Sequence, residues 1–214
     1  PRRYNHSLSQ SILVAAQLGG GAVLLESRTY VPLGSILTTA NVKLYGAKRP
    51  YFNAGATGLQ NGTIIQGPLE YKADNLEFHD LGVDSGSAVC TALYAGVAQQ
   101  GLTCTVTILA GEPQFVGLVV ENVITIGQSA VAAIHAFACE GYTRARINGV
   151  DTLFGTHGQA YKVIQTQVTN LKSRGNSSNG VIIKSDAIRQ TSDSSFRGIN
   201  AVSYTHLRAH ETKA

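Results

Sequence analysis

The chain has 214 residues, of which 43% are hydrophobic, so it is long and apolar enough for one globular domain, or at most two. Charged residues make up only 14%, against about 25% in an average soluble domain, and this excludes a charge-rich coiled coil. No apolar run approaches the roughly 18 residues of a membrane-spanning helix, which excludes a transmembrane protein and predicts no membrane partner.

The formal net charge of +4 comes from 17 basic and 13 acidic residues, mostly scattered along the chain. This excess is too small to indicate nucleic-acid binding, so we expect no nucleic-acid partner. A mild positive charge suits an acidic ligand such as an anionic polysaccharide, but it fits many neutral roles equally well. The cysteines signal neither a disulfide framework nor a zinc site, and no metal ligand is predicted; one bridge or three buried thiols would fit their wide spacing. They are Cys90, Cys104 and Cys139.

The first predicted element is a short amphipathic helix over residues 7–18, which the glycines at 19–21 end. Its apolar residues at helical spacing are Leu8, Ile12, Ala15 and Ala16. Residues 23–25 predict a buried strand, residues 30–31 begin another extended piece, and the alternation over 41–46 predicts a further strand. Beyond residue 46 the sequence predicts no other helix, only short strands broken by Gly, Asn, Asp and Ser.

One short pattern recurs along the rest of the chain: an apolar residue, a polar one, a small turn-former and another apolar residue. Its copies begin at Phe78, Val120, Ile147 and Val168, with a weaker copy at Ile199. The steps between these positions are 42, 27, 21 and 31 residues. Steps near 21–27, or twice that, indicate a coiled stack of short parallel strands with loops of variable length inserted.

The repeats therefore predict an all-β solenoid, because one such coil is too small to bury its own apolar side chains and must stack on its neighbours. A β-sandwich or barrel is the competing all-β fold, and it should show hairpin turns every 8–12 residues or so. Strong hairpin signals are scarce; the nearest are Asn61-Gly62 and Asn148-Gly149.

A second set of residues follows the same spacing. His135, His157 and Lys184 are 22 and 27 residues apart, so a regular register would place them on one outward column of three consecutive coils. Since coils lie about 4.8 Å apart, such a column can follow a glycan chain. Lys184 would pair with a uronate carboxylate, and a histidine could act as acid or base near neutral pH. Alternatively, the histidines cap hydrogen-bonding ladders and Lys184 is merely solvated.

The predicted site contains three catalytic residues and five that bind substrate. The catalytic residues are His157, Lys184 and Asp186, and the substrate-binding residues are His135, Arg144, Arg146, Glu140 and Asp151. The arginines could bind an acidic sugar or serve as a lyase-type base. Asp84 is a further carboxylate candidate, and Cys90 a candidate for an earlier position of the column.

The opening of the chain resembles the N-terminal cap and first strand of the pectate-lyase-like right-handed parallel β-helix superfamily. The matching residues are Ile12, Ala15-Ala16, Gly19–Leu25 and Thr29-Tyr30, although Glu26-Ser27-Arg28 replaces the usual Pro-x-Gly. Residues 41–47 and the repeats look like later coils, so the resemblance covers nearly all of residues 5–203. It implies a right-handed single-stranded parallel β-helix with a short N-terminal capping helix.

Within that superfamily the chain is most similar to the polygalacturonase-like glycoside hydrolases of family 28. Gly155-Thr156-His157-Gly158 resembles their histidine motif with one inserted residue, and Ile182-Ile183-Lys184 resembles their lysine motif without its Arg. The two acidic motifs should lie one and two coils earlier, where His135-Ala136 and Glu112-Pro113-Gln114 stand instead. Those carboxylates are the acid and base of hydrolysis, so the family mechanism is not carried over.

The resemblance implies a carbohydrate-active protein that acts on a uronate-containing polysaccharide as a glycoside hydrolase or a polysaccharide lyase. It implies no cofactor, apart from Ca²⁺ for a lyase, and a secreted or periplasmic location. The alternative is a non-catalytic glycan-binding or phage tail-spike or adhesin segment, monomeric as an enzyme but trimeric as a spike.

Both ends of the sequence predict a truncated β-helix domain over residues 1–203. The chain begins at Pro1 and contains no Met, so we expect the initiator and any signal peptide to lie outside it. Residues 203–212 resemble the peptide translated from sequencing-adapter DNA at the end of a metagenomic contig, so residues 204–214 are expected to be a non-native tail.

Overall fold

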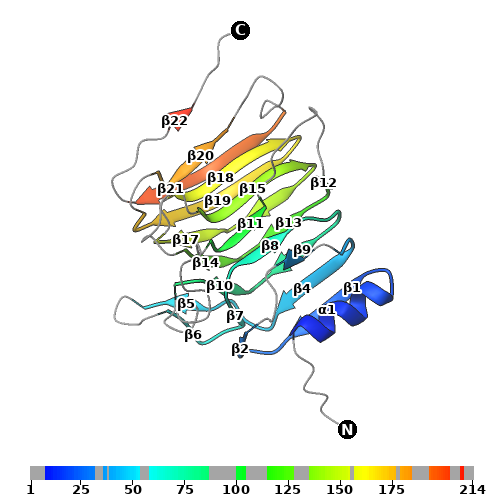
Figure 1. Cartoon of the computed structure of the whole chain (residues 1–214). Coiled ribbons are helices and arrows are strands. Elements are labelled where there is room, and N and C mark those ends of the chain that lie inside the picture. The colour runs from blue at the N-terminus through cyan, green and yellow to red at the C-terminus, as the bar shows by residue number, and fades with distance from the viewer. Residues whose placement is uncertain are drawn as a thin grey trace.

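The computed structural model describes residues 8–31, 36–37, 39–53, 58–86, 100–104, 115–127, 135–154, 157–176, 179–184, 193–202 and 208–209. Its strands wind upward in one stack of parallel coils, from α1 (Leu8–Gln17) and β1 (Gly21–Leu25) at one end to β20 and β21 at the other (Figure 1). The predicted right-handed parallel β-helix with an N-terminal capping helix is confirmed.

Each coil contributes strands to three faces, which we number in chain order. Face 1 contains β1, β4 (Val42–Gly46), β9 (Glu77–His79), β13 (Val119–Glu121), β16 (Arg146–Asn148) and the first halves of β19 (Gln167–Arg174) and β21 (Ser195–Val202). Face 2 contains β2 (Thr29–Tyr30), β7 (Ile64–Gln66), β10 (Gly82–Asp84), β14 (Ile124–Ile126), β17 (Asp151–Leu153) and the second halves of β19 and β21.

Face 3 contains β3 (Ile36–Leu37), β8 (Leu69–Tyr71), β11 (Leu102–Cys104), β15 (His135–Thr143), β18 (His157–Ile164), β20 (Val181–Ile183) and β22 (Arg208–Ala209). β12 (Phe115–Val116) pairs with the end of β15. β5 (Tyr51–Phe52) and β6 (Leu59–Gln60) form an antiparallel pair. Two residues of the expected tail thus pair as β22 with β20.

The repeat predicted from the sequence is the register of face 1. Phe78 pairs with Val120, Val120 with Ile147, and Ile147 with Val168. The copy placed at Ile199 is wrong by three residues, because Val168 pairs with Phe196 and Ile199 pairs with Leu171. Gly198 occupies the turn position that Asn170 holds one coil earlier, so Phe196 is the true start of that copy.

A single left-handed residue turns the chain from face 1 to face 2 in successive coils. These residues are Asp80, Asn122, Gly149, Asn170 and Gly198, with φ between 52° and 70°. Asn, Asp and Gly tolerate this conformation better than other residues. Asn122 Nδ2 donates to Asp80 Oδ1 at 2.6 Å, so the side chains also form a ladder between coils.

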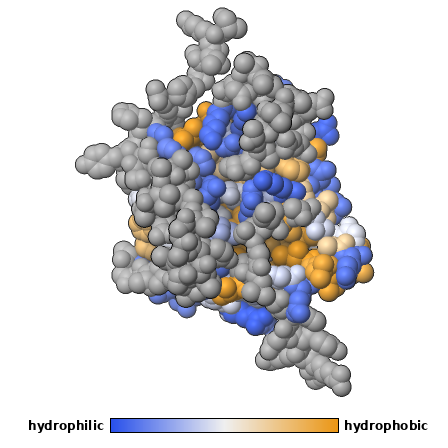
Figure 2. Space-filling view, in the orientation of Figure 1, coloured by the Kyte–Doolittle hydropathy of each residue, from blue (hydrophilic) through white to orange (hydrophobic). Residues whose placement is uncertain are grey.

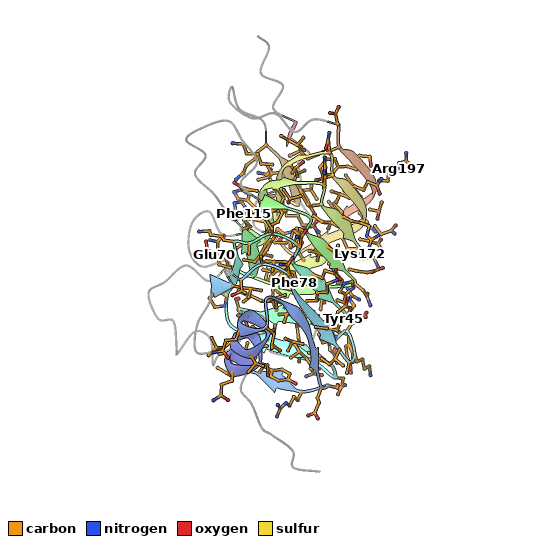
Figure 3. All side chains as sticks on the ribbon, turned by 90° about the vertical axis from the view of Figure 1, so that its right-hand side faces the viewer. Tyr45, Glu70, Phe78, Phe115, Lys172 and Arg197 are labelled. Atoms are coloured by element: carbon orange, nitrogen blue, oxygen red, sulfur yellow. The ribbon has the colours of Figure 1, made fainter. Side chains whose placement is uncertain are left out.

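The core consists of vertical columns of inward side chains. On face 1 the column is fully buried and contains Leu44, Phe78, Val120, Ile147 and Val168. Face 3 adds the buried rings of Tyr71, Phe137, Tyr142 and Tyr161. Each tyrosine hydroxyl has an acceptor; Tyr71, for example, donates to the Ala138 carbonyl at 2.7 Å. Figure 3 shows Phe78 inside the stack and Tyr45 on its outside.

The N-terminal end carries exposed apolar side chains, which gather around α1 and β1 (Figure 2). They include Leu18 and Leu24, 78% and 79% exposed. The expectation of a fully buried strand at residues 23–25 is therefore wrong for Leu24, because the pleat of β1 turns alternate residues outward. In the described part of the chain, no helix has the length and apolar character to cross a bilayer.

Two of the three cysteines lie inside face 3. Cys104 and Cys139 are register neighbours on β11 and β15, are fully buried and are free thiols. Cys90 lies outside the described residues. For the two described cysteines, buried thiols rather than a bridge are what the structure shows.

We expect Phe78→Ala to lower the free energy of unfolding by about 3–5 kcal/mol, because it empties a fully buried position beside Tyr71. Leu24→Ala, at an exposed position of the neighbouring column, should change it by about 0.5 kcal/mol or less. Urea unfolding measures both. Equal losses would contradict the inward direction of Phe78.

Candidate functional site

Two histidines meet at the start of consecutive strands on face 3. His135 opens β15 and His157 opens β18, and the register pairs them as predicted. Their rings stack with centroids 5.3 Å apart and an interplanar angle of 29°. His135 is 8% exposed, while His157 is half-buried. The step of 22 residues between them is therefore one coil.

Both imidazoles are held in the neutral form. Burial lowers the pKa of His135 to about 4, and the positive charge of Lys184 and the neighbouring His157 add to the effect. The pKa of His157 is also lowered, first by burial and then by Lys184. Near pH 7 both rings are therefore neutral, the form in which an imidazole can accept a proton.

Lys184 lies on the same face but not in the histidine column, which corrects the predicted register. Its backbone N donates to the Tyr161 carbonyl at 2.7 Å, which places it beside Lys162. The residue one coil after His157 is Asn179, whose Nδ2 lies 3.4 Å from His157 Nδ1. That coil has 22 residues, the difference between 179 and 157, so the step of 27 overshoots the column by five positions.

An ion pair joins Lys184 to the other predicted carboxylate of this face. Lys184 Nζ donates to Glu140 Oε1 at 2.6 Å, across the column in which Glu140 pairs with Lys162. The Glu140 side chain is 9% exposed and that of Lys184 is 37% exposed. Because Lys184 also lowers both histidine pKa values, we call His135, His157, Glu140 and Lys184 together the face-3 site.

The remaining predicted residues do not join this site. Asp186 lies outside the described residues. Arg144 occupies a left-handed turn with φ 55° between faces 3 and 1, and Arg146 begins β16 on face 1. Asp151 lies on face 2, where Arg174 bonds it at 2.7 Å and Arg49 at 3.4 Å. These predictions failed because sequence proximity to the column was used, although two turns separate the faces.

Asp84 has a structural role. It is 1% exposed, and its carboxylate accepts from the Leu59 backbone N at 2.9 Å and the Gly86 backbone N at 3.1 Å. The first of these bonds holds β6 against face 2. Asp84 is therefore built into the scaffold rather than offered to a substrate.

A polar network on face 1 was missed by the sequence reasoning. Glu77 accepts from Lys43 Nζ at 2.6 Å and Tyr45 OH at 2.9 Å, and contacts His79 Nε2 at 3.0 Å. The other ring nitrogen of His79 lies 3.4 Å from Glu121, and the ring stacks on Tyr45 at 4.5 Å. Although burial alone would raise it, hydrogen bonds from Lys43, His79 and Tyr45 lower the pKa of Glu77 to about 2.

The signal for this network was present in the repeats. Lys43 and Tyr45 flank the core residue Leu44 by one position, and Glu77 and His79 flank Phe78 in the same way. In a strand the residues on either side of an inward one point outward. The repeat that gave the core therefore also gives the outward ladders.

The described residues do not fit the Ca²⁺ implied for a lyase. Calcium takes six to eight oxygen ligands. The described carboxylates on the outward side of face 3, Glu70 and Glu140, are each bonded to a lysine. Across the described ranges there is no cluster of three or more His, Cys, Asp or Glu side chains placed to hold an ion. No step below uses a metal.

No protein-family model matches the chain, and neither does any curated protein sequence. Two solved structures are similar. A candidate glycosyl hydrolase from Parabacteroides merdae ATCC 43184 is 11% identical, with a TM-score of 0.56, over 94% of this chain and 89% of that one. A pectin methylesterase in complex with a hexasaccharide is 10% identical, with a TM-score of 0.55, over 94% of this chain and 64% of that one. At these identities the similarity establishes the fold.

We expect acid to destabilise the protein through His135. Its folded pKa of about 4 lies below the ordinary 6.5, so the unfolded chain binds a proton that the folded chain excludes as the pH falls between these values. The free energy of unfolding should fall by up to about 3 kcal/mol from pH 7 to pH 4 for this group. Urea unfolding of His135→Phe should lack this share of the pH dependence. The same dependence in both proteins would contradict a buried neutral imidazole.

Proposed function

We propose that the protein is carbohydrate-active and cleaves a uronate-containing polysaccharide at the face-3 site, with His157 as the general base of a β-elimination. The fold supports a carbohydrate ligand, because the two similar solved structures are a candidate glycosyl hydrolase and a pectin methylesterase. The observation that carries the chemistry is a half-exposed neutral imidazole in the field of a lysine.

Elimination suits these residues better than hydrolysis. Glycoside hydrolysis uses two carboxyl groups, one of which must be protonated to act as the acid. Among the described outward residues of face 3, the carboxylates Glu70 and Glu140 are each bonded to a lysine 2.5 Å and 2.6 Å away. Two carboxylates that are engaged in this way do not form an acid and base pair. The polygalacturonase-like mechanism therefore gains no support from these positions.

In the proposed reaction His157 removes the proton from the sugar carbon beside the uronate carboxylate. The electron pair left behind forms a carbon–carbon double bond, the bond to the glycosidic oxygen breaks, and that oxygen takes up a proton. Because Asn179 contacts Nδ1, Nε2 is the ring nitrogen that faces away from it and receives the substrate proton. His135 stacks on the ring and positions it.

The cations of this face would bind the acidic substrate. Lys184 is 37% exposed, and its ammonium is fixed by Glu140 rather than mobile. A uronate carboxylate that approaches Lys184 gains a charge-assisted hydrogen bond, and the positive charge stabilises the negative charge that develops on proton removal. Asp186 stays a predicted catalytic residue, and secretion or a periplasmic location stays a prediction from the resemblance.

Glycan binding without cleavage is the second candidate function. It is favoured by the Lys184–Glu140 pair, which already occupies the cation of the site. In a tail-spike or adhesin the same face would bind the polysaccharide and release it unchanged. The trimeric state of such a spike is part of this second proposal.

We expect wild-type protein to release products absorbing at 235 nm from polygalacturonate, pectin, alginate or rhamnogalacturonan. His157→Gln should lower kcat about 100-fold or more through loss of the base. Lys184→Ala should chiefly raise KM. His79→Gln, a histidine on face 1, is the matched control and should keep wild-type activity. The rate should fall as the pH drops through the lowered pKa of His157, because the base becomes protonated.

Three outcomes would change the proposal. Full activity in His157→Gln and Lys184→Ala would remove the site assignment. Reducing-sugar release without absorbance at 235 nm would show hydrolysis instead. Binding without any product from the four substrates would favour the non-catalytic function.

A further inference from the structure

Charge is unevenly distributed over the outward surface of face 1. In its first coils cations and carboxylates are matched, since Lys43 is bonded to Glu77 and His79 lies between Glu77 and Glu121. From β16 onward exposed cations predominate. We call these residues the basic strip; they are Arg144, Arg146, Lys172 and Arg197.

The cations of the basic strip are not neutralised by the protein. The ion pairs formed by residues in the described ranges include none of these four. The carboxylate next to Lys172 in register, Asp151, is already bonded to Arg174 and Arg49. Much of the +4 excess of the chain is therefore concentrated here.

The register places the strip along the axis of the solenoid. Arg146 pairs with Gln167 and Gln167 with Ser195, so Arg197 lies two coils above Arg146 and two positions further along the strand. Coils are about 4.8 Å apart, comparable to the length of one sugar residue. Lys172 and Arg197 project from the side that also carries Tyr45 (Figure 3). The strip thus extends from face 1 to the start of face 2.

Neutral polar side chains fill the space between these cations. Asn148 Oδ1 accepts from Thr169 Oγ1 at 3.0 Å and from Asn170 Nδ2 at 2.9 Å, which links two coils. The aromatic residue of these strands, Phe196, packs inward against Tyr161 at 5.4 Å. The surface therefore offers charge and hydrogen bonds but no ring on which a nucleic-acid base could stack.

We propose that the basic strip binds a linear polyuronate along the solenoid axis, at a site separate from the face-3 site. Its arginines would bind successive carboxylates, with two parallel hydrogen bonds each where the geometry allows, and the amides and hydroxyls between them would bind sugar hydroxyls. The inference goes beyond the proposed function, because this surface holds polymer whether or not His157 cleaves it.

The test compares the binding of polygalacturonate by two variants with the same change of net charge. Arg146→Gln/Arg197→Gln removes two cations of the strip. Arg28→Gln/Lys48→Gln removes two exposed cations elsewhere and is the matched control. His157→Gln, used here as a third variant, prevents cleavage during the measurement. Thermal unfolding of each protein checks that it is folded.

We expect the strip variant to lose about tenfold or more in affinity at 0.1 M salt, whereas the control should change about twofold or less. His157→Gln should bind as the wild type does, which separates this proposal from the catalytic one. Neutral dextran should not bind. The inference is overturned if the strip variant binds like the wild type, if both double variants lose equally, or if double-stranded DNA competes more strongly than polygalacturonate.

Discussion

The hydrogen bonds between successive coils determine everything else in this molecule. They run between parallel strands whose register is fixed residue by residue, so each side chain has a defined neighbour above and below it. A coil could not exist alone, since its few apolar side chains are buried only against those of the next coil. The columns Leu44–Phe78–Val120–Ile147–Val168 inside and Glu140–Lys162–Lys184 outside are products of the same constraint.

The three outward surfaces use this register for different chemistry. Face 3 combines stacked neutral imidazoles with a fixed ion pair, which suits proton transfer next to an acidic substrate. Face 1 begins with a network around the strongly ionised Glu77 and continues into unmatched cations, which suits binding. Face 2 is used structurally, with Asp84 and Asp151 bonding the scaffold. Charge and burial rather than residue type alone decide which surface can do which task.

Much of the fold could be predicted because its information is periodic. The helix at residues 8–17, the core repeat and the pairing of His135 with His157 all followed from spacing. Lys184 was misplaced because an insertion changes the step from 22 to 27 without leaving a local mark. Arg146 and Asp151 were assigned to the wrong surface, since one left-handed residue such as Gly149 moves the chain to another face. The Glu77 network was missed because only the inward half of the repeat was used.

The stretch from Ile147 to Val168 spans one complete coil of 21 residues, with every turn in its standard place. Excising it would join two ends that already have the same direction and height, so the solenoid could lose one storey without a change of architecture. His157 would leave with that storey, whereas His135 and Lys184 would remain. Chemistry in such a molecule is therefore modular, and its copy number of coils can change independently of the reaction that any one coil supports.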